Sequence, residues 1–358
     1  MKAALMSLGS VSSQWTSQAM RKYFDSVDDI DVRSVEVHLE GGKLEVLYQG
    51  KPLPPFECIY AKGSFRYAQT LRSVTTALYK TTYMPIKPAT FTLGHDKLLT
   101  HLVLQLDNIP MPNTYIASST TAAKKILDTI NYPIIFKLPS GTGGKGVMYA
   151  ESFAAASSLL DTLMTLRQPF IIQEYIETSG EDIRVIVAGE KVIASMKRKA
   201  VVGEKRANYH SGGAGIPHTP DSYTQKICLQ AAKAIGADIC AIDVLESIKG
   251  PLVIEVNLSP GLQLITKTTG IDVADRIARY LFERTKSIRE AGAKKETGEI
   301  MKQINIEKKA GEQQIVTNLD FRGERILLPK LATDMTQFSS KDEFVLKVSK
   351  GKLVIEKV

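Results

Sequence analysis

The sequence predicts an α/β fold followed by a small β-rich unit at the C-terminal end. Over residues 1–285, short apolar runs typical of strands alternate with helical patterns, as in domains that pack helices against sheets. A glycine-rich loop joins two of the predicted strands, and an acid-bearing hairpin follows later in the chain. At 358 residues the chain is long enough for two or three domains.

The composition is that of an ordinary globular protein, with 44% hydrophobic and 23% charged residues. No apolar stretch is long enough to span a bilayer, and the opening residues turn polar too quickly for a signal peptide, so we expect a cytoplasmic protein without a membrane partner. The three cysteines are far apart, which argues against zinc or a disulfide framework. A net charge of +8 fits an anionic partner without choosing among a nucleotide, a polyanionic small molecule and nucleic acid.

The N-terminal residues open as a nucleotide-binding-like α/β layer, with a strand over 2–8, a loop over 9–13 and a helix over 14–24. The loop lacks a G-x-G-x-x-G fingerprint, so no dinucleotide site is predicted. Pro85 and Pro88 mark the boundary to a second domain. Before this boundary we expect a hairpin over 32–39 and 44–48, a strand over 56–61 and a helix over 69–79.

Two cations and two aromatic rings follow the strand over 56–61, where α/β sheets often place ligand contacts. Lys62 and Arg66 are the cations. From the residues alone, a solvated loop is the stronger interpretation.

The acid-bearing hairpin has strands over 240–245 and 252–258 with a turn near Lys249. This register puts Asp243 opposite Glu255 and places Asn257 on the same face. Facing carboxylates repel unless a proton or a cation lies between them, and an all-oxygen set suits magnesium. A hairpin with a solvated polar face is the alternative. The opposite face should be core, formed by Ile242, Val244, Leu252, Ile254, Val256 and Leu258.

A second candidate site combines a strand over 133–138, which carries Lys137, with a loop rich in glycine. Burying an unpaired ammonium group is expensive, so Lys137 requires an anionic partner. Glycines without Cβ atoms allow backbone N–H groups to approach phosphate oxygens. A strand over 147–149 follows, so this is not a Walker loop, and Lys137 argues against a plain glycine-rich hairpin. The loop glycines are Gly141, Gly143, Gly144 and Gly146.

Other charged residues have plainer interpretations when taken alone. Asp182 and Arg184 at a strand start would form a surface ion pair, and the cations over 197–206 would form a solvated or nucleic-acid-binding patch. The remaining elements are helices over 95–106, 153–166 and 222–235 and strands over 170–173, 184–187 and 191–196. Asp221 caps the start of the third helix and Gly236 follows its end.

The motifs resemble those of RimK-like ATP-grasp ligases, the α-L-glutamate ligase family. Residues 250–281 resemble the end of the family's ATP-grasp domain, residues 180–184 fit its G-x-D-I-R motif, and residues 196–213 fit M-x-R-x-A…R-x-N-x-H-x-G-G. The resemblance covers most of residues 1–285. It implies a Rossmann-like pre-ATP-grasp domain over 1–88 and an ATP-grasp domain over 89–285, with a flap lobe at about 112–175 and a metal-binding lobe over 176–285.

The resemblance also implies roles for individual residues. Magnesium, with manganese as an alternative, would bind Asp243, Glu255 and Asn257, while Lys97 and Lys137 would contact the phosphates of ATP. It makes Lys62 and Arg66 candidates for the acceptor substrate. The chain has His210-Ser211-Gly212-Gly213 where ribosomal-protein-modifying members have His-Arg-Gly-Gly, which puts the acceptor in doubt. The other expected residues are Glu174, Tyr175 and Ile176 beside adenine, Asp182 and Asn208 on the nucleotide, and Arg184, Arg198 and Arg206 on the transferred phosphoryl group.

The activity implied is an ATP- and magnesium-dependent carboxylate–amine ligase that acts through an acyl phosphate. Glutamate or a similar amino acid would be the amine donor, and the acceptor would be a glutamyl-tailed cofactor, a protein C-terminus or an amino-group carrier protein. The alternative is a nucleotide-sensing regulator whose tail binds nucleic acid, although a pure sensor would not need the metal-binding residues.

The C-terminal residues depart from this resemblance. We expect a charged linker over 286–312 and short strands over 313–358 around a turn at Lys350 and Gly351. The strands are similar to AbrB-type swapped-hairpin modules, which dimerise and in many cases bind DNA. Because the charges are mixed, we expect a dimerisation or docking unit in a homo-oligomer, a dimer or tetramer, and no nucleic-acid partner.

Overall fold

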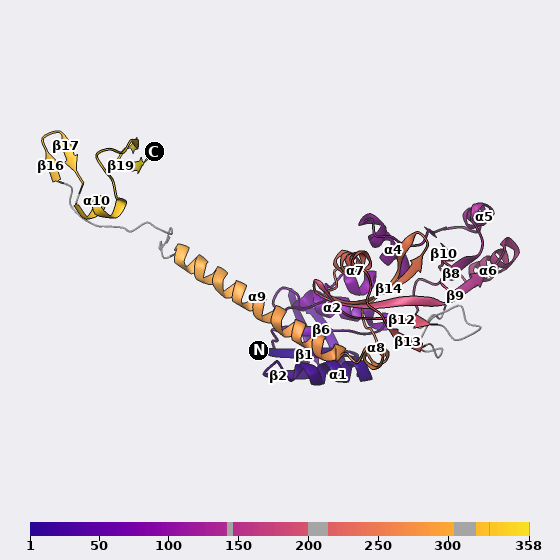
Figure 1. Ribbon diagram of the computed structural model, residues 1–358. Coiled ribbons are helices and arrows are strands. Elements are labelled where there is room, and N and C mark those ends of the chain that lie inside the picture. The colour runs from indigo at the N-terminus through magenta and orange to yellow at the C-terminus, as the bar shows by residue number, and fades with distance from the viewer. Residues whose placement is uncertain (142–145, 200–213, 304–319, 329, 358) are drawn as a thin grey trace. The chain divides into compact units, whose positions relative to one another are not determined.

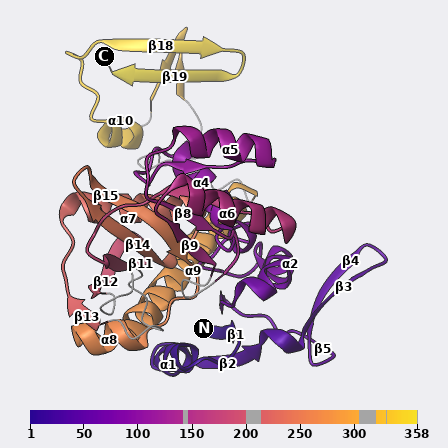
Figure 2. The same ribbon diagram turned by 90° about the vertical axis from the view of Figure 1, so that its right-hand side faces the viewer.

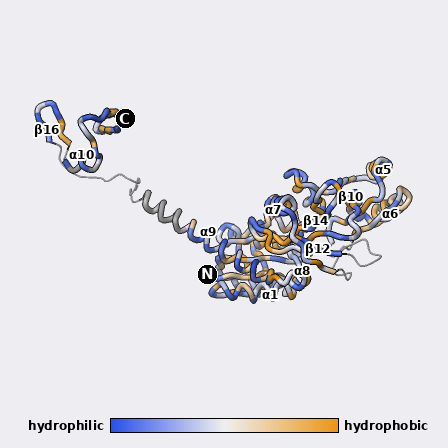
Figure 3. Tube along the Cα trace, viewed as in Figure 1, coloured by the Kyte–Doolittle hydropathy of each residue, from blue (hydrophilic) through white to orange (hydrophobic). Residues whose placement is uncertain are grey.

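The computed structural model describes residues 1–141, 146–199, 214–303, 320–328 and 330–357. The chain forms two compact units, Met1–Gly292 and Ala293–Val358, which are described separately (Figure 1). None of the helices in the described ranges is both long and apolar enough to cross a membrane. In Figure 3 the most apolar stretches lie along the elements of the first unit.

The first unit begins with a three-stranded parallel sheet in the order β2-β1-β6. Its central strand β1 is apolar and almost wholly buried, as expected for a parallel strand covered on both faces. The helix α1 begins at Val11, inside the predicted loop, because the Ser10 hydroxyl accepts a hydrogen bond from the N–H of Ser13 and caps the helix there. The elements are β1 (Lys2–Ser7), α1 (Val11–Met20), β2 (Ser26–Asp31) and β6 (Cys58–Ala61).

A three-stranded antiparallel ribbon, β3-β4-β5, projects from this domain in Figure 2. It confirms the predicted hairpin, with Val37 paired to Val46. The helices that follow lead into the second part of the unit. These elements are η1 (Val32–Ser34), β3 (Val35–Glu40), β4 (Lys43–Tyr48), β5 (Lys51–Pro52), η2 (Phe65–Tyr67), α2 (Ala68–Leu78), α3 (Thr90–Leu93) and α4 (Lys97–Leu106).

A four-stranded antiparallel sheet, β7-β10-β8-β9, has a core of its own. Leu127 of α5 and Leu160 of α6 are fully buried against Ile134 and Phe136 of the central strand β8. The two predicted strands on either side of this loop, β8 and β9, are therefore held by helices that cover the sheet. The elements are β7 (Thr114–Tyr115), α5 (Thr120–Thr129), β8 (Ile134–Lys137), β9 (Val147–Ala150), α6 (Phe153–Thr165) and β10 (Ile171–Glu174).

A five-stranded antiparallel sheet in the order β13-β12-β11-β14-β15 shares one continuous core with the N-terminal sheet. The predicted hairpin is confirmed, with Asp243 directly opposite Glu255. Helix α7 also begins and ends as expected, at an Asp221 cap and a left-handed Gly236. The elements are β11 (Glu181–Ala188), β12 (Lys191–Lys199), β13 (Ala214–Pro217), α7 (Ser222–Ile235), β14 (Ile239–Ser247), β15 (Gly250–Asn257), α8 (Gln263–Thr269) and α9 (Val273–Gln303).

In the second unit, the described residues after α9 form two hairpins and a short helix. The predicted hairpin around Lys350 and Gly351 is confirmed, and Gly351 takes the positive φ of +74° that its turn requires. Residues 286–303 of the expected linker continue α9. The elements are β16 (Asp320–Arg322), β17 (Arg325–Leu327), α10 (Lys330–Thr336), β18 (Phe344–Ser349) and β19 (Lys352–Lys357). The likeness to swapped-hairpin modules stays a prediction.

We predict that Gly236→Ala destabilises the protein more than Gly270→Ala. Both glycines end helices with positive φ, +81° and +68°, and a left-handed alanine costs about 1–2 kcal/mol. A Cβ at Gly236 would also lie 3.0 Å from Lys87 and from the buried hydroxyl of Thr90, whereas nothing lies within 4 Å at Gly270. Urea unfolding of both variants checks this order, and equal losses would contradict it.

Candidate active site

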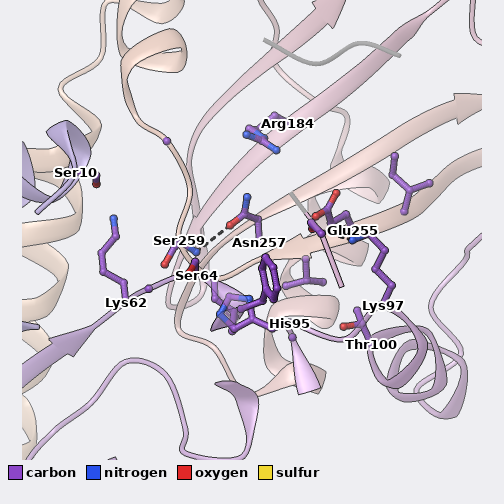
Figure 4. A pocket seen from close by; sticks show the side chains of 18 of the residues that line it. Ser10, Lys62, Ser64, His95, Lys97, Thr100, Arg184, Glu255, Asn257 and Ser259 are labelled. Atoms are coloured by element: carbon purple, nitrogen blue, oxygen red, sulfur yellow. Dashed lines mark hydrogen bonds between the residues drawn. The ribbon is translucent and has the colours of Figure 1, made fainter. Parts of the chain in front are cut away.

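A cavity of about 430 Å³ lies inside the first unit, where the N-terminal sheet meets the five-stranded sheet. Four parts of the chain form its walls: the N-terminal end of α1, the loop after β6, the start of α4, and the strands β11, β12 and β15 with the loop that follows β15. The volume falls within the usual range for small-molecule sites. Figure 4 shows its polar side chains.

The acid-bearing ribbon supplies one wall of this cavity. Glu255 and Asn257 of β15 both line it and lie close together in Figure 4. The Asn257 Oδ1 accepts a hydrogen bond of 2.9 Å from the N–H of Ser259, which fixes the amide plane. The polar face of this hairpin therefore faces the cavity at Glu255 and Asn257.

A β-bulge changes the opposite face of the hairpin. Asp243 pairs with Glu255, but the next residue Val244 pairs with Val253, so Ile254 is an extra residue in the ladder. Ile254 therefore lines the cavity and Val253 takes its place in the core, with no exposed surface. The expectation that Ile254 belongs to the core face is wrong for this reason.

Four charged side chains on three adjacent strands form a buried cluster beside the cavity. Arg184 of β11 donates to both carboxylate oxygens of Asp243 on β14, at 2.8 and 2.7 Å. Arg198 of β12 donates to both oxygens of Asp182, at 2.6 and 2.5 Å, and to Asp243 at 2.9 Å. Asp182, Arg198 and Asp243 are at most 8% exposed, so the surface ion pair expected from Asp182 and Arg184 alone is wrong.

The electrostatic environment differs between the two acids. Burial raises the pKa of Asp182 to about 6, against the hydrogen bonds from Arg198 that lower it. Burial alone would also raise the pKa of Asp243, but the charges of Arg184 and Arg198 outweigh it and hold that pKa well below its usual range. Asp243 is therefore ionised throughout the physiological range, and its charge is shared by two guanidinium groups.

The ribbon offers oxygen ligands for a hard cation. In the described ranges, no three side chains of His, Cys, Asp and Glu come together as a metal-binding group, so an ion here would also need Asn257. Asp243 Oδ1 accepts one hydrogen bond and keeps one acceptor site, and Glu255 has no described hydrogen-bond partner. Two carboxylates and one amide oxygen match the chemistry of magnesium, provided that Asp243 shares its charge with the arginines.

Two lysines flank this acidic wall. The Lys97 ammonium lines the cavity and donates to the carbonyl of Gly141 at 3.1 Å. Lys137 donates to the neutral amide oxygen of Gln173 at 2.6 Å, and no carboxylate among the described residues pairs with it directly. Burial lowers the pKa of Lys137 to about 8, while the charge of Glu255 raises it. Lys137 therefore lacks a directly bonded anionic partner within the described residues, and an anionic ligand would supply one.

The predicted adenine-binding segment lies at the end of β10, outside the described lining of the cavity. The N–H of Glu174 donates to the carbonyl of Asn113 at 3.0 Å, and the N–H of Tyr175 donates to that of Pro133 at 3.3 Å. Both donors are used inside the protein, so a base bound here would need other backbone groups of this segment. Ile176 follows directly.

Some of the remaining predicted residues are described by the structure, and the others lie outside the described ranges. Gly141 lines the cavity, and Gly146 follows the loop with a φ of +78° beside Leu138. Arg66 is exposed at the surface, whereas Lys62 is buried in the cavity wall. Outside the described residues lie Gly143, Gly144, Arg206, Asn208 and the His210-Ser211-Gly212-Gly213 segment.

His95 and Ser259 are among the cavity residues that sequence reasoning missed. The His95 Nε2 and the Ser259 Oγ are buried atoms without a hydrogen-bond partner in the described structure. The sequence predicts His95 only as the start of a helix, and no pattern singles out Ser259. No spacing rule links these two positions, which are brought together by folding.

The arrangement of these sheets is that of solved ATP-grasp ligases. The solved ATP-grasp ligase PsnB, in complex with a precursor variant, Mg and ADP, superposes with a TM-score of 0.63 at 15% identity, over 79% of this chain and 98% of that chain. This likeness shows the fold.

The sequence comparisons identify the family. Residues 94–281 match the RimK-like ATP-grasp domain. A probable alpha-L-glutamate ligase of Vibrio cholerae is 35% identical over 280 residues, which are 76% of this chain and 91% of that protein. A ribosomal protein bS6–L-glutamate ligase of Escherichia fergusonii is 33% identical over 267 residues, 71% of this chain and 86% of that protein. The chain therefore belongs to the RimK-like ATP-grasp family and is a ligase of the carboxylate–amine class.

We predict that Arg198→Met lowers the free energy of unfolding by about 3–5 kcal/mol, because Asp182 and Asp243 lose a counter-charge that they share in a buried site. Arg33→Met is the matched control. Arg33 also forms an ion pair, with 2.6 Å between its Nη2 and an oxygen of Asp31, but its side chain is 60% exposed. It should change stability little. Chemical denaturation measures both variants, and similar losses for the two would contradict the assignment.

Proposed function

We propose that this protein is an ATP- and magnesium-dependent ligase that joins the amino group of L-glutamate, or a similar amino acid, to a carboxylate of its acceptor. The observation that carries the proposal is the meeting of Glu255 and Asn257 with Lys97 and Arg184 around one cavity. An acidic ribbon bordered by cations suits a metal–triphosphate complex, in which the metal needs anionic ligands and the phosphates need cationic ones.

The reaction would proceed in two steps. An oxygen of the acceptor carboxylate attacks the γ-phosphorus of ATP, and the bond from this phosphorus to the β,γ-bridging oxygen breaks. ADP departs, and the acceptor becomes an acyl phosphate. The amine then attacks the acyl carbon, inorganic phosphate departs, and the nitrogen loses a proton to solvent. Neither step requires a protein nucleophile, so the residues act by binding and by stabilising charge.

The described residues can be given parts in these steps. Glu255 and Asn257, with the free acceptor site of Asp243, would hold magnesium. A bound magnesium ion would neutralise phosphate charge during the transfer. Lys97 and Lys137 would contact the phosphates. Arg184 binds Asp243 through Nε and Nη2, which leaves its Nη1 group for a phosphoryl oxygen.

The substrate assignment rests on the relatives' names. One is named a probable alpha-L-glutamate ligase and another a ribosomal protein bS6–L-glutamate ligase, which supports glutamate as donor and a peptide or protein C-terminus as acceptor. A small-molecule cofactor with a glutamyl tail is the alternative acceptor. We further propose that the protein is a cytoplasmic homo-oligomer and that manganese can replace magnesium.

The second candidate is a nucleotide-sensing regulator with a nucleic-acid-binding C-terminal unit. The mixed charges of that unit, with Lys347 paired to Glu356 across its hairpin, give this candidate less support. Phosphate release that depends on both an amino acid and an acceptor supports the ligase. ATP binding without turnover, together with salt-sensitive binding to duplex DNA, supports the regulator.

We predict that Glu255→Gln lowers the ATP-dependent ligation rate at least about 100-fold, because an amide cannot supply the negative charge that a cation requires. Glu246→Gln is the matched control on the same ribbon, because Glu246 pairs with Lys197 away from the cavity. ADP release and product mass are measured for both variants. A wild-type rate in Glu255→Gln would remove the metal assignment.

We predict that Lys137→Met raises the apparent KM for ATP about 10- to 100-fold, because it removes a charged contact to a phosphate. Lys125 is an exposed lysine in the same part of the chain, and Lys125→Met should leave the KM unchanged. An unchanged KM in Lys137→Met would show that Lys137 does not contact the nucleotide.

A further inference from the structure

Lys62 is a buried cation without an anionic partner. It follows β6 directly, is 4% exposed and lines the cavity, yet its ammonium has no hydrogen bond or ion pair within the described residues. The nearest described interaction is a distance of 5.6 Å to the centroid of the Tyr60 ring. An ammonium group in that position loses its hydration with little in return, and burial lowers the pKa of Lys62 to about 8.

Other polar groups without partners line the same cavity. The His95 Nε2 and the Ser259 Oγ are buried and form no described hydrogen bond. Buried polar groups are normally satisfied, so these two atoms, together with the unpaired ammonium of Lys62, indicate that a polar ligand binds in the cavity. Burial lowers the pKa of His95 to about 4, so Lys62 is the one of the three that carries charge near neutral pH.

Lys62 lies at the opposite side of the cavity from Lys97 and Glu255. Figure 4 shows Lys62 and Ser10 on one side, Lys97 and Glu255 on the other, and Asn257 and Ser259 between them. The N-terminal end of α1 contributes Ser10 and Ser13 to the Lys62 side, and its positive end favours an anion. The metal–triphosphate complex is placed at the Glu255 side, so the Lys62 side is left for another substrate.

We propose that Lys62 binds a carboxylate of a substrate that does not itself react, with Ser259 and His95 as further hydrogen-bond partners. This inference rests on the proposed ligase function. The carboxylate is supplied either by the incoming amino acid, through its α- or side-chain group, or by the acceptor, through the side chain of the residue before the one that is activated. A planar carboxylate would satisfy the ammonium and the hydroxyl together.

The test compares charged and neutral substrates with wild-type protein and the Lys62→Met variant. In the donor arm, L-glutamate is compared with L-glutamine and L-isoglutamine, each of which lacks one carboxylate. In the acceptor arm, a peptide ending in Glu-Glu is compared with one ending in Gln-Glu. ADP release and product mass give kcat/KM for every pair.

We expect wild-type protein to prefer the charged substrate about 10- to 100-fold in one arm, the effect of one hydrogen bond between charged groups. Lys62→Met should lose that preference, and the arm in which this happens identifies the source of the carboxylate. The exposed Lys80 provides the control Lys80→Met, which should keep the preference.

The unfolding temperature separates a binding role from a structural one. Methionine fills similar space without a charge, so Lys62→Met should unfold at the wild-type temperature or above it. A markedly lower unfolding temperature, or a charge preference that is absent in wild-type protein or unchanged in the variant, would overturn the proposal. Wild-type protein that releases no ADP with any pair contradicts the ligase function instead.

Discussion

The site depends on the ion pairs that join Asp243 to Arg184 and Arg198. Asp243 is 3% exposed, and an uncompensated carboxylate at that depth would cost several kcal/mol. The two guanidinium groups come from the neighbouring strands β11 and β12, so they neutralise Asp243 and fix the register of three strands together. Because Asp243 also faces Glu255 across the next ladder, this register decides which side of the ribbon presents acid to the cavity.

Some charged side chains at the cavity form ion pairs within the protein, and others have no oppositely charged partner among the described residues. The arginines of the cluster are neutralised by Asp182 and Asp243. Lys62 is buried and Lys137 is half-buried, and neither has a described carboxylate partner in hydrogen-bonding contact. Such residues cost stability in the free protein and gain interactions when an anion binds. Binding sites are where this loss is tolerated, and both lysines line or adjoin the proposed positions of anionic groups.

The sequence predicts local features well because these depend on neighbouring residues. The alternation of apolar and polar residues and a turn near Lys249 predict the β14–β15 ribbon. Asp221 and Gly236 predict the two ends of α7. The bulge that turns Ile254 into the cavity has no such signal. The ion pair between Arg184 and Asp243 joins residues 59 positions apart, so no local pattern predicts it. Strand β2 carries three acids and lies at the edge of its sheet, so its sequence does not show the apolar pattern that predicts a strand.

The proposed ligase requires a divalent cation between Glu255 and Asn257, beside the triphosphate of ATP. The most direct measurement is a crystal structure with manganese and a non-hydrolysable ATP analogue, since manganese can be located by its anomalous scattering. We predict one anomalous peak at bonding distance, about 2.0–2.3 Å, from oxygens of Glu255 and Asn257, with the γ-phosphate as a further ligand. A metal–nucleotide complex bound elsewhere, or a nucleotide bound here with no metal at either residue, would contradict the account.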